Sequence, residues 1–287
     1  MYLEPIVRNE ILTLKTEGDL HIVWLGTGAA FTKDNNETNL ILIKGDDHVV
    51  IDFGTLASNA IWEIGKLYLH DLKTFLPTHS HADHVGGLEK VALYNRYVAI
   101  PRMNKSKVRM IVDPSYEEIL WDRTLRGGLE WNEEGLNGAR MNLRDYFDII
   151  RPKLIPERKR ETWEVNVGGI HLEIFRTRHY PGTAMSWEDA FRSVGILVDH
   201  RVFISMDTMF DEDLIDTYKD AEILFHDVCF CEGNVHAPLS KLKELDPEIK
   251  RKMKLIHLPD NWYEYEREIR DSGFRGVTKK GERYVFE

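Results

Sequence analysis

Cysteine is scarce in this sequence of 287 residues: Cys229 and Cys231 are its only two, and a single residue separates them. Two such close neighbours cannot build a framework of disulfide bonds, so we expect a reducing compartment and a cytoplasmic protein. A Cys-x-Cys pair without a second pair is also a weak signal for a metal site. We therefore predict that both cysteines are small buried residues.

Long apolar runs and an excess of basic residues are absent as well. No window approaches the ~18 consecutive apolar residues of a membrane helix, so we expect no contact with a membrane. Lysine and arginine number 38 against 48 acidic residues, which gives a formal charge of −10. An acidic chain offers no general basic surface for a long nucleic acid, although bound cations could still attract a small phosphate compound.

Against this background, one stretch concentrates metal-competent side chains. His79, His81, Asp83 and His84 fall within six residues and are followed by Gly86 and Gly87. The apolar residues 74–76 before them predict the end of a buried strand, so the cluster is expected on the loop that leaves it. Imidazoles together with a carboxylate suit zinc, manganese or iron, and one tight cluster can serve two adjacent ions.

This stretch resembles the His-x-His-x-Asp-His signature of the metallo-β-lactamase superfamily. The resemblance implies an α/β fold, namely an αββα sandwich of two mixed β-sheets flanked by helices, with a two-metal hydrolytic site. It implies a single domain over residues 1–287 and two divalent ions per chain, with zinc expected and manganese or iron as alternatives.

The resemblance also implies how the ligands are shared. One ion would be held by His79, His81 and His179, the other by Asp83, His84 and His257, and Asp207 would bridge them. Two cations roughly 3.5–4 Å apart lower the pKa of a water between them and stabilise charge on the attacked group. Asp83 is the expected acceptor of the proton of that water.

Apolar runs bounded by turn residues predict the other elements. Strands are expected at 11–14 (an edge strand), 21–25, 39–43, 49–54, 163–167, 170–175, 193–198, 201–208 and, as the last strand, 253–258. Helices are expected at 56–69 and 239–252. Residues 100–160 are less regular and are predicted to be a helical insertion over the site. Their aromatic residues, Trp121 and Tyr146 among them, either fill a helix–sheet seam or stack on a ring of the ligand.

Within the superfamily, residues 25–30 and 51–54 resemble the opening of the ribonuclease Z group, and residues 221–227 resemble a later motif of that group. Asp207 lies where the family carries Gly-Asp-Thr, with Met206 in place of the glycine. An expelled alkoxide benefits from a general acid, for which His236 is the first candidate and His226 the second. His226 could instead orient a ligand or a buried carboxylate. A homodimer is implied by the same resemblance.

In ribonuclease Z a long arm grips tRNA and lies between the third ligand and the bridging aspartate. Here only 28 positions separate His179 from Asp207, and two predicted strands occupy them. The pattern Asp227-x-Cys229, followed by Val235-His236-Ala237 and by the Pro-Glu-Ile-Lys segment at 247–250, resembles armless relatives of ribonuclease Z, which include cyclic-nucleotide phosphodiesterases of the anti-Pycsar type. The leading hypothesis is a two-metal phosphodiesterase that cleaves a small phosphodiester such as a 3′,5′-cyclic nucleotide. The alternatives are a tRNA 3′-processing endoribonuclease, a thioester or lactone hydrolase, and a non-hydrolytic ligand carrier or di-iron protein.

Overall fold

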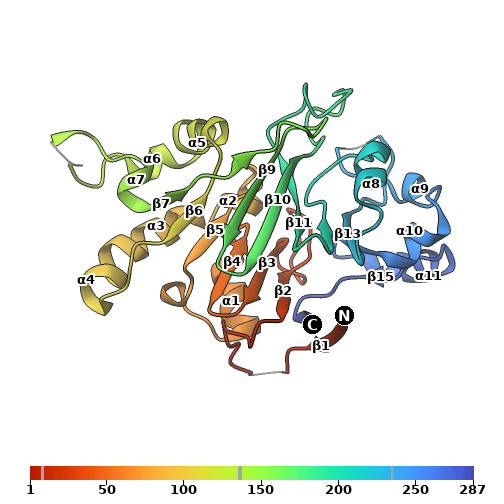
Figure 1. Cartoon of the computed structure of the whole chain (residues 1–287), viewed down its shortest axis with the longest axis horizontal. Helices are drawn as coiled ribbons and strands as arrows, with labels where there is room; N and C mark the ends of the chain where they lie inside the picture. Colours follow the sequence, from red (N-terminus) through yellow and green to blue (C-terminus); the bar gives the residue numbers. More distant parts are fainter. Residues whose placement is uncertain (8–9, 135–137, 234) are drawn as a thin grey trace.

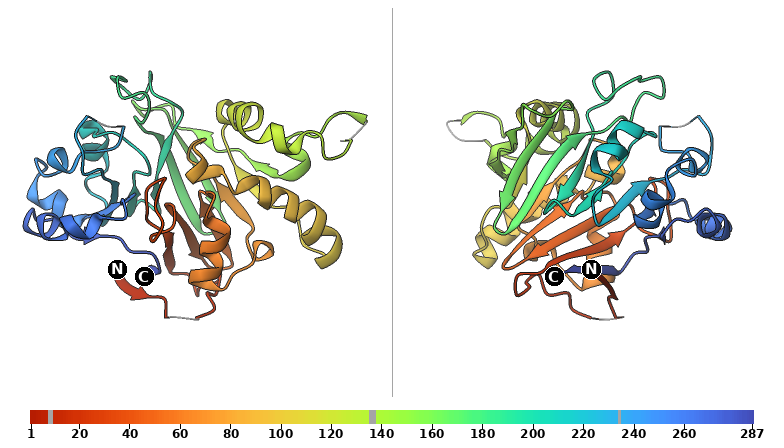
Figure 2. Two further views of the ribbon diagram at one scale, coloured as in Figure 1. Left: turned by 180° about the vertical axis from the view of Figure 1, so that it is seen from behind. Right: turned by 45° about the vertical axis from the view of Figure 1, so that its right-hand side comes forward.

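The computed structural model describes residues 1–7, 10–134, 138–233 and 235–287, in which two β-sheets pack face to face between two layers of helices (Figure 1). Figure 2 shows from two further sides that the helix layers cover opposite outer faces of the paired sheets. The αββα arrangement predicted from the sequence is thereby confirmed.

Each sheet has eight strands. The first sheet contains, in spatial order, β1 (Tyr2–Pro5), β16 (Glu282–Phe286), β2 (Leu20–Gly26), β3 (Asn39–Lys44), β4 (Asp47–Ile51), β5 (Thr74–Leu76), β6 (Arg109–Ile111) and β7 (Asp148–Ile150). The second contains β15 (Gly276–Val277), β14 (Met253–Ile256), β13 (Ile223–Asp227), β12 (Val202–Ile204), β11 (Val194–Val198), β10 (Ile170–Arg176), β9 (Thr162–Val167) and β8 (Lys153–Leu154). Strands β4 to β7 run parallel, as do β12 to β15.

The helices follow from capping residues and apolar faces. They are α1 (Ala57–Gly65), α2 (Ala82–Val85), α3 (Leu88–Tyr94), α4 (Ile100–Met103), α5 (Pro114–Leu120), α6 (Arg126–Leu129), α7 (Leu143–Tyr146), α8 (Glu212–Tyr218), α9 (Leu239–Leu242), α10 (Pro247–Lys252) and α11 (Glu266–Asp271). Short 3-10 helices are η1 (Leu69–Asp71) and η5 (Trp262–Tyr265), while η2 (Asn95–Ala99) and η3 (Trp121–Leu125) are π-helical stretches that join α3 to α4 and α5 to α6. Among the described residues, none of these helices has the length and apolarity to cross a membrane.

Alternating side chains of the strands build the three apolar layers. In β2, Ile22 and Trp24 belong to the core between the sheets, whereas Val23 and Leu25 belong to the core under the helices. Trp24 contacts Phe225 of the second sheet with ring centroids 5.0 Å apart. This pairing helps to fix how the two sheets lie on each other, and with them the loops at their edges.

Three sequence predictions of local structure are wrong. Residues 11–14 form no strand: Ile11 is 73% exposed, and the edge strand is β1 instead. Residues 253–258 do not contain the last strand, because β16 returns to the first sheet and pairs with β2. The helix expected over 239–252 is two helices, since Asp246 caps a new helix that starts at Pro247.

The segment 100–160 is only partly helical. It contains α4 to α7, but β6 and β7 extend the first sheet and β8 extends the second. Strands of two or three residues are too short to show an alternating pattern, which is why the sequence indicates helices alone. Tyr146 is fully buried and Trp121 packs against the same core, so both fill the helix–sheet seam. Of the two cysteines, Cys229 is buried as predicted and Cys231 is exposed.

Candidate metal centre

The loop after β5 carries four of the predicted ligands: His79, His81, Asp83 and His84. They are buried except His81, which is half-buried at the start of α2. The loop packs on the residues that follow β4, where the amide of Phe53 donates to the carbonyl of His84 at 2.7 Å. A Cβ atom at Gly54 would lie 1.9 Å from the carbonyl oxygen of Asp83, so the approach requires glycine.

Loops of the second sheet carry the other three predicted ligands. His179 follows β10, Asp207 follows β12 and His257 follows β14, and all three are buried. Both β12 and β14 are parallel neighbours of β13, so their carboxyl ends meet at one edge of the sheet. The structure therefore brings ligands from two sheets to one place.

The donor atoms of the predicted ligands form two overlapping groups, in each of which they lie within 4.8 Å of one another, and Asp207 also forms a third such group with Asp227 and His236. One group is His79, His81, His179 and Asp207, and the other is Asp83, His84, His257 and Asp207. Asp207 joins them: its Oδ2 lies 3.6 Å from His179 Nε2, and its Oδ1 lies 3.3 Å from His257 Nδ1. The groups match the division that the resemblance implies for two ions, while the binding of ions stays a prediction.

The donor set fits divalent cations. His84 Nε2 and Asp207 Oδ1 are buried and have no hydrogen-bond partner among the described residues. Leaving a buried polar atom unpaired costs ~1–3 kcal/mol, and a cation between such atoms would remove this penalty. Neutral imidazole and carboxylate are the donors that zinc, manganese and iron accept in proteins.

Hydrogen bonds from outside the cluster orient its histidines. Asp52 Oδ2 lies 2.5 Å from His84 Nδ1, and the carbonyl oxygen of Val235 lies 3.0 Å from His179 Nδ1. Since both oxygens are acceptors, each Nδ1 carries a proton, and Nε2 is the atom of each ring that faces the cluster and could coordinate a cation once it carries no proton.

Burial sets the protonation of most of these histidines. In four of them burial is the largest influence on the pKa and lowers it: His79, His81, His179 and His257. The pKa of His179 falls to about 4. They are therefore neutral and able to coordinate a metal at pH 7. In His84 burial also acts to lower the pKa, but the carboxylates of Asp207, Asp52 and Asp83 outweigh it and raise the pKa well above its usual value.

Backbone strain is concentrated beside the cluster. Asp52, Met206 and His257 have φ values of 60°, 48° and 61°, a left-handed conformation that glycine adopts more easily. Strain at such positions persists only where the surrounding structure enforces it, which is common at functional sites.

Of the two candidates for the general acid, only His236 lies at the cluster. Its Nδ1 is 2.7 Å from Asp227 Oδ2 and 4.0 Å from Asp207 Oδ2. Burial lowers the pKa of His236, but Asp227 and then Asp207 raise it to about 9. His226 is fully buried, its Nδ1 lies 2.8 Å from the backbone oxygen of Asp227, and it belongs to none of the donor groups found among the described residues.

Two carboxylates of this centre had no role in the sequence analysis. Both sit in motifs that were noted only as family resemblance; Asp52 directly follows β4, and Asp227 is the last residue of β13. A buried acidic residue at the end of an apolar run is the signal that could have identified each of them. Tyr180 and Phe191, which contact the cluster from the loop between β10 and β11, were missed because that loop has no periodic pattern.

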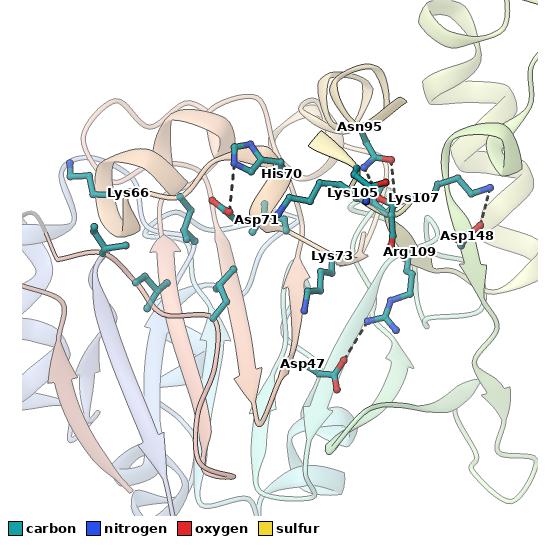
Figure 3. A pocket seen from close by; sticks show the side chains of 18 residues that line it. Asp47, Lys66, His70, Asp71, Lys73, Asn95, Lys105, Lys107, Arg109 and Asp148 are labelled. Atoms are coloured by element: carbon teal, nitrogen blue, oxygen red, sulfur yellow. Dashed lines mark hydrogen bonds and ion pairs between the residues drawn. The ribbon is translucent and has the colours of Figure 1, made fainter. Parts of the chain in front are cut away.

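A hollow of about 790 Å³ lies elsewhere, at the opposite ends of the first-sheet strands (Figure 3). Its lining includes Lys73, just before β5, whereas the cluster follows β5. Two of its cations are paired, Lys107 with Asp148 at 2.8 Å and Arg109 with Asp47 at 3.5 Å. None of the predicted ligands lines it.

Comparison with known proteins places the chain in context. The family model described as "Anti-Pycsar protein Apyc1" matches residues 20–284. The Anti-Pycsar protein Apyc1 of Bacillus phage 010DV004 is 33% identical over 272 residues, which are 93% of this chain and 98% of that protein.

Solved structures agree on the fold. The metallo-β-lactamase fold protein YhfI from Bacillus subtilis superposes with a TM-score of 0.65 at 13% identity, covering 93% of this chain and 99% of that one. The short form of human tRNase Z gives a TM-score of 0.60 at 12% identity, covering 93% and 98%. At these identities the likeness establishes the metallo-β-lactamase fold alone.

Proposed function

The chain belongs to the anti-Pycsar protein Apyc1 family, and from this premise we propose that it is a metal-dependent phosphodiesterase acting on a small phosphodiester such as a 3′,5′-cyclic nucleotide. The observation that carries the proposal is the buried His/Asp cluster with an ion-paired histidine at its side. A cluster that only bound metal would not need a protonated acid next to it.

The two groups of donors described above would each hold one divalent cation, with Asp207 between them. When bound, the cations supply Lewis acidity, which lowers the pKa of water and offsets negative charge on the phosphodiester. Asp83, which is 6% exposed, is placed to accept the proton of the attacking water.

His236 would protonate the leaving oxygen. Asp227 occupies its Nδ1, so the Nε2–H remains to donate, and the carboxylates of Asp227 and Asp207 raise the pKa of the ring and so favour its protonated form. Its side chain is 20% exposed, unlike the fully buried His226, so a substrate can reach it. A second hydrogen bond holds Asp227 in place, because its Oδ2 also accepts from the amide of Thr208 at 3.0 Å.

A small substrate suits this chain better than tRNA. The residues between His179 and Asp207 form β11, β12 and their loops, which leaves no separate arm. The formal charge of −10 disfavours a long polyanion. A cytoplasmic homodimer without membrane contact is the expectation carried over from the scarcity of cysteine and from the family resemblance.

The test is hydrolysis by zinc- or manganese-loaded protein of 3′,5′-cyclic nucleotides, bis-p-nitrophenyl phosphate, a pre-tRNA, a thioester and a lactone. We expect turnover of cyclic nucleotides that is lost on chelation and in Asp83→Ala. If no phosphodiester is hydrolysed but the thioester or lactone is, the proposed substrate class is wrong.

The acid is tested separately with His236→Ala. A cyclic nucleotide expels an alkoxide that needs a proton, whereas p-nitrophenolate leaves without one, so the variant should slow the former by on the order of 10²-fold and the latter far less. His200→Ala removes an exposed histidine as a matched control. Equal losses on both substrates would exclude His236 as the acid.

A further inference from the structure

The loop between β10 and β11 places an exposed aromatic ring against the cluster. The ring of Tyr180 lies with its centroid 5.2 Å from that of His81 and 4.9 Å from that of His179, nearly perpendicular to both. Tyr180 is 43% exposed, whereas His179 is fully buried. The tyrosine therefore stands at the boundary between the buried cluster and solvent.

Phe191, at the other end of the same loop, supports this position. Its ring is stacked on His81 at 5.2 Å with an interplanar angle of 14°. Its amide also donates to the carbonyl oxygen of Tyr180. The two aromatic residues thus hold His81 between them and tie the two ends of the loop together.

The loop is braced internally. The guanidinium of Arg176 donates to the carbonyl oxygens of Trp187 at 3.0 Å and Ala190 at 3.2 Å. The carboxylate of Asp189 accepts the amide of Met185 at 3.0 Å. Because these bonds fix the backbone, ordering the loop when a ligand arrives costs little, and such pre-organisation is typical of recognition sites.

Other aromatic residues first considered for stacking are not available. Tyr146 is fully buried and Trp121 packs into the core under the helices. Tyr180 combines solvent exposure with contact to two candidate ligands, so a group attached to a phosphodiester through one sugar is within its reach.

We propose that Tyr180 is the stacking surface for the nucleobase of the substrate. The inference rests on the proposed function. Every base has a π face, so a tyrosine beside the metal centre would accept purines and pyrimidines alike. Stacking of one base on an aromatic side chain is worth enough to change affinity on the order of tenfold.

The experiment compares kinetics of the metal-loaded wild type with Tyr180→Ala and Tyr180→Phe. Substrates are cyclic AMP, cyclic CMP and the cyclic phosphate of 1-deoxyribose, which has no base. In Tyr180→Ala we expect KM for cyclic AMP and for cyclic CMP to rise on the order of tenfold, and KM for the abasic compound not at all. Tyr180→Phe keeps the ring and should restore the wild-type KM values. Tyr263→Ala, at a distant tyrosine that is 63% exposed, is the matched control.

Metal content is measured in every variant, because a merely structural role at His81 would lower it. Loss of metal in Tyr180→Ala, or equal changes on all three substrates, would overturn the inference. A loss in Tyr180→Phe as large as in Tyr180→Ala would show that the hydroxyl acts instead of the ring, and would overturn it as well.

Calorimetric measurement of the binding of the phosphorothioate analogues of cyclic AMP and cyclic CMP distinguishes failure of the proposed function from failure of this inference. If the wild type hydrolyses no cyclic nucleotide but binds the analogues in a Tyr180-dependent way, the proposed function falls and the inference stands. If neither hydrolysis nor binding occurs, both fall.

Discussion

Replacing Asp52 by asparagine should weaken metal binding although Asp52 is not itself a predicted ligand. Asp52 is 1% exposed, and its Oδ2 lies 2.5 Å from His84 Nδ1. The same carboxylate accepts the amide and the hydroxyl of Thr78 at 2.6 and 2.7 Å. It is therefore fixed in place as an acceptor, and it forces the proton of His84 onto Nδ1.

Asparagine keeps the shape of this group but not its acceptor capacity. Its single oxygen can still receive the Thr78 amide, which leaves the NH₂ group facing the Nδ1 of His84. The imidazole then favours the tautomer with the proton on Nε2, the atom that lies 3.3 Å from Asp207 Oδ1. A protonated Nε2 cannot coordinate a cation.

Loss of such an orienting partner typically lowers metal affinity 10- to 100-fold. This corresponds to about 1.4–2.7 kcal/mol of binding free energy. No reduction for solvent screening applies, because both side chains are fully buried. We expect Asp52→Asn to fall within this range.

The assay is a zinc titration of metal-free protein against a fluorescent chelator, with circular dichroism to establish that the variant is folded. Asp211→Asn is a suitable control, since Asp211 is 11% exposed and caps α8 but contacts none of the predicted ligands. A folded Asp52→Asn that binds zinc as tightly as the wild type would refute the argument from tautomers.

Three further predictions concern stability. Arg192→Leu leaves the buried carboxylate of Asp113 without its ion pair and should lower the free energy of unfolding by about 3–5 kcal/mol. An unchanged midpoint of urea unfolding would contradict this. Burial lowers the pKa of His48 to about 4, so the unfolded chain binds its proton first. This group alone should remove about 3 kcal/mol of stability between pH 6.5 and 4, and His48→Gln should lose that much less than the wild type. Met206→Gly relieves a left-handed backbone but removes a fully buried side chain, so its free energy of unfolding should fall by a net of about 2 kcal/mol and its melting temperature should fall with it.

The metal-ligand cluster was the part of the site most accessible from the sequence. His79, His81, Asp83 and His84 are close in sequence, so their proximity follows from chain geometry once a strand is recognised before them. His179, Asp207 and His257 were placed by strand ends and by family resemblance. Their convergence depends on the parallel order of β12 to β14, which no local pattern reveals.

The supporting residues escaped prediction for the same reason. The contact of Asp52 with His84 joins residues 32 positions apart through the neighbouring strands β4 and β5. The return of β16 beside β2 pairs the two ends of the chain. Contacts of this kind are decided by which strands become neighbours, whereas propensity and periodicity report only on single elements.

Because the two sheets each supply part of the cluster, metal binding and sheet packing are linked. His84 comes from the first sheet and His257 from the second, and both lie 3.3 Å from Oδ1 of Asp207. A cation held by these residues would join the two sheets by polar bonds at their loop edge. Between the sheets, by contrast, the contact of Trp24 with Phe225 is apolar. Free energy gained on binding would then add to the stability of the folded state, since the unfolded chain cannot assemble the site.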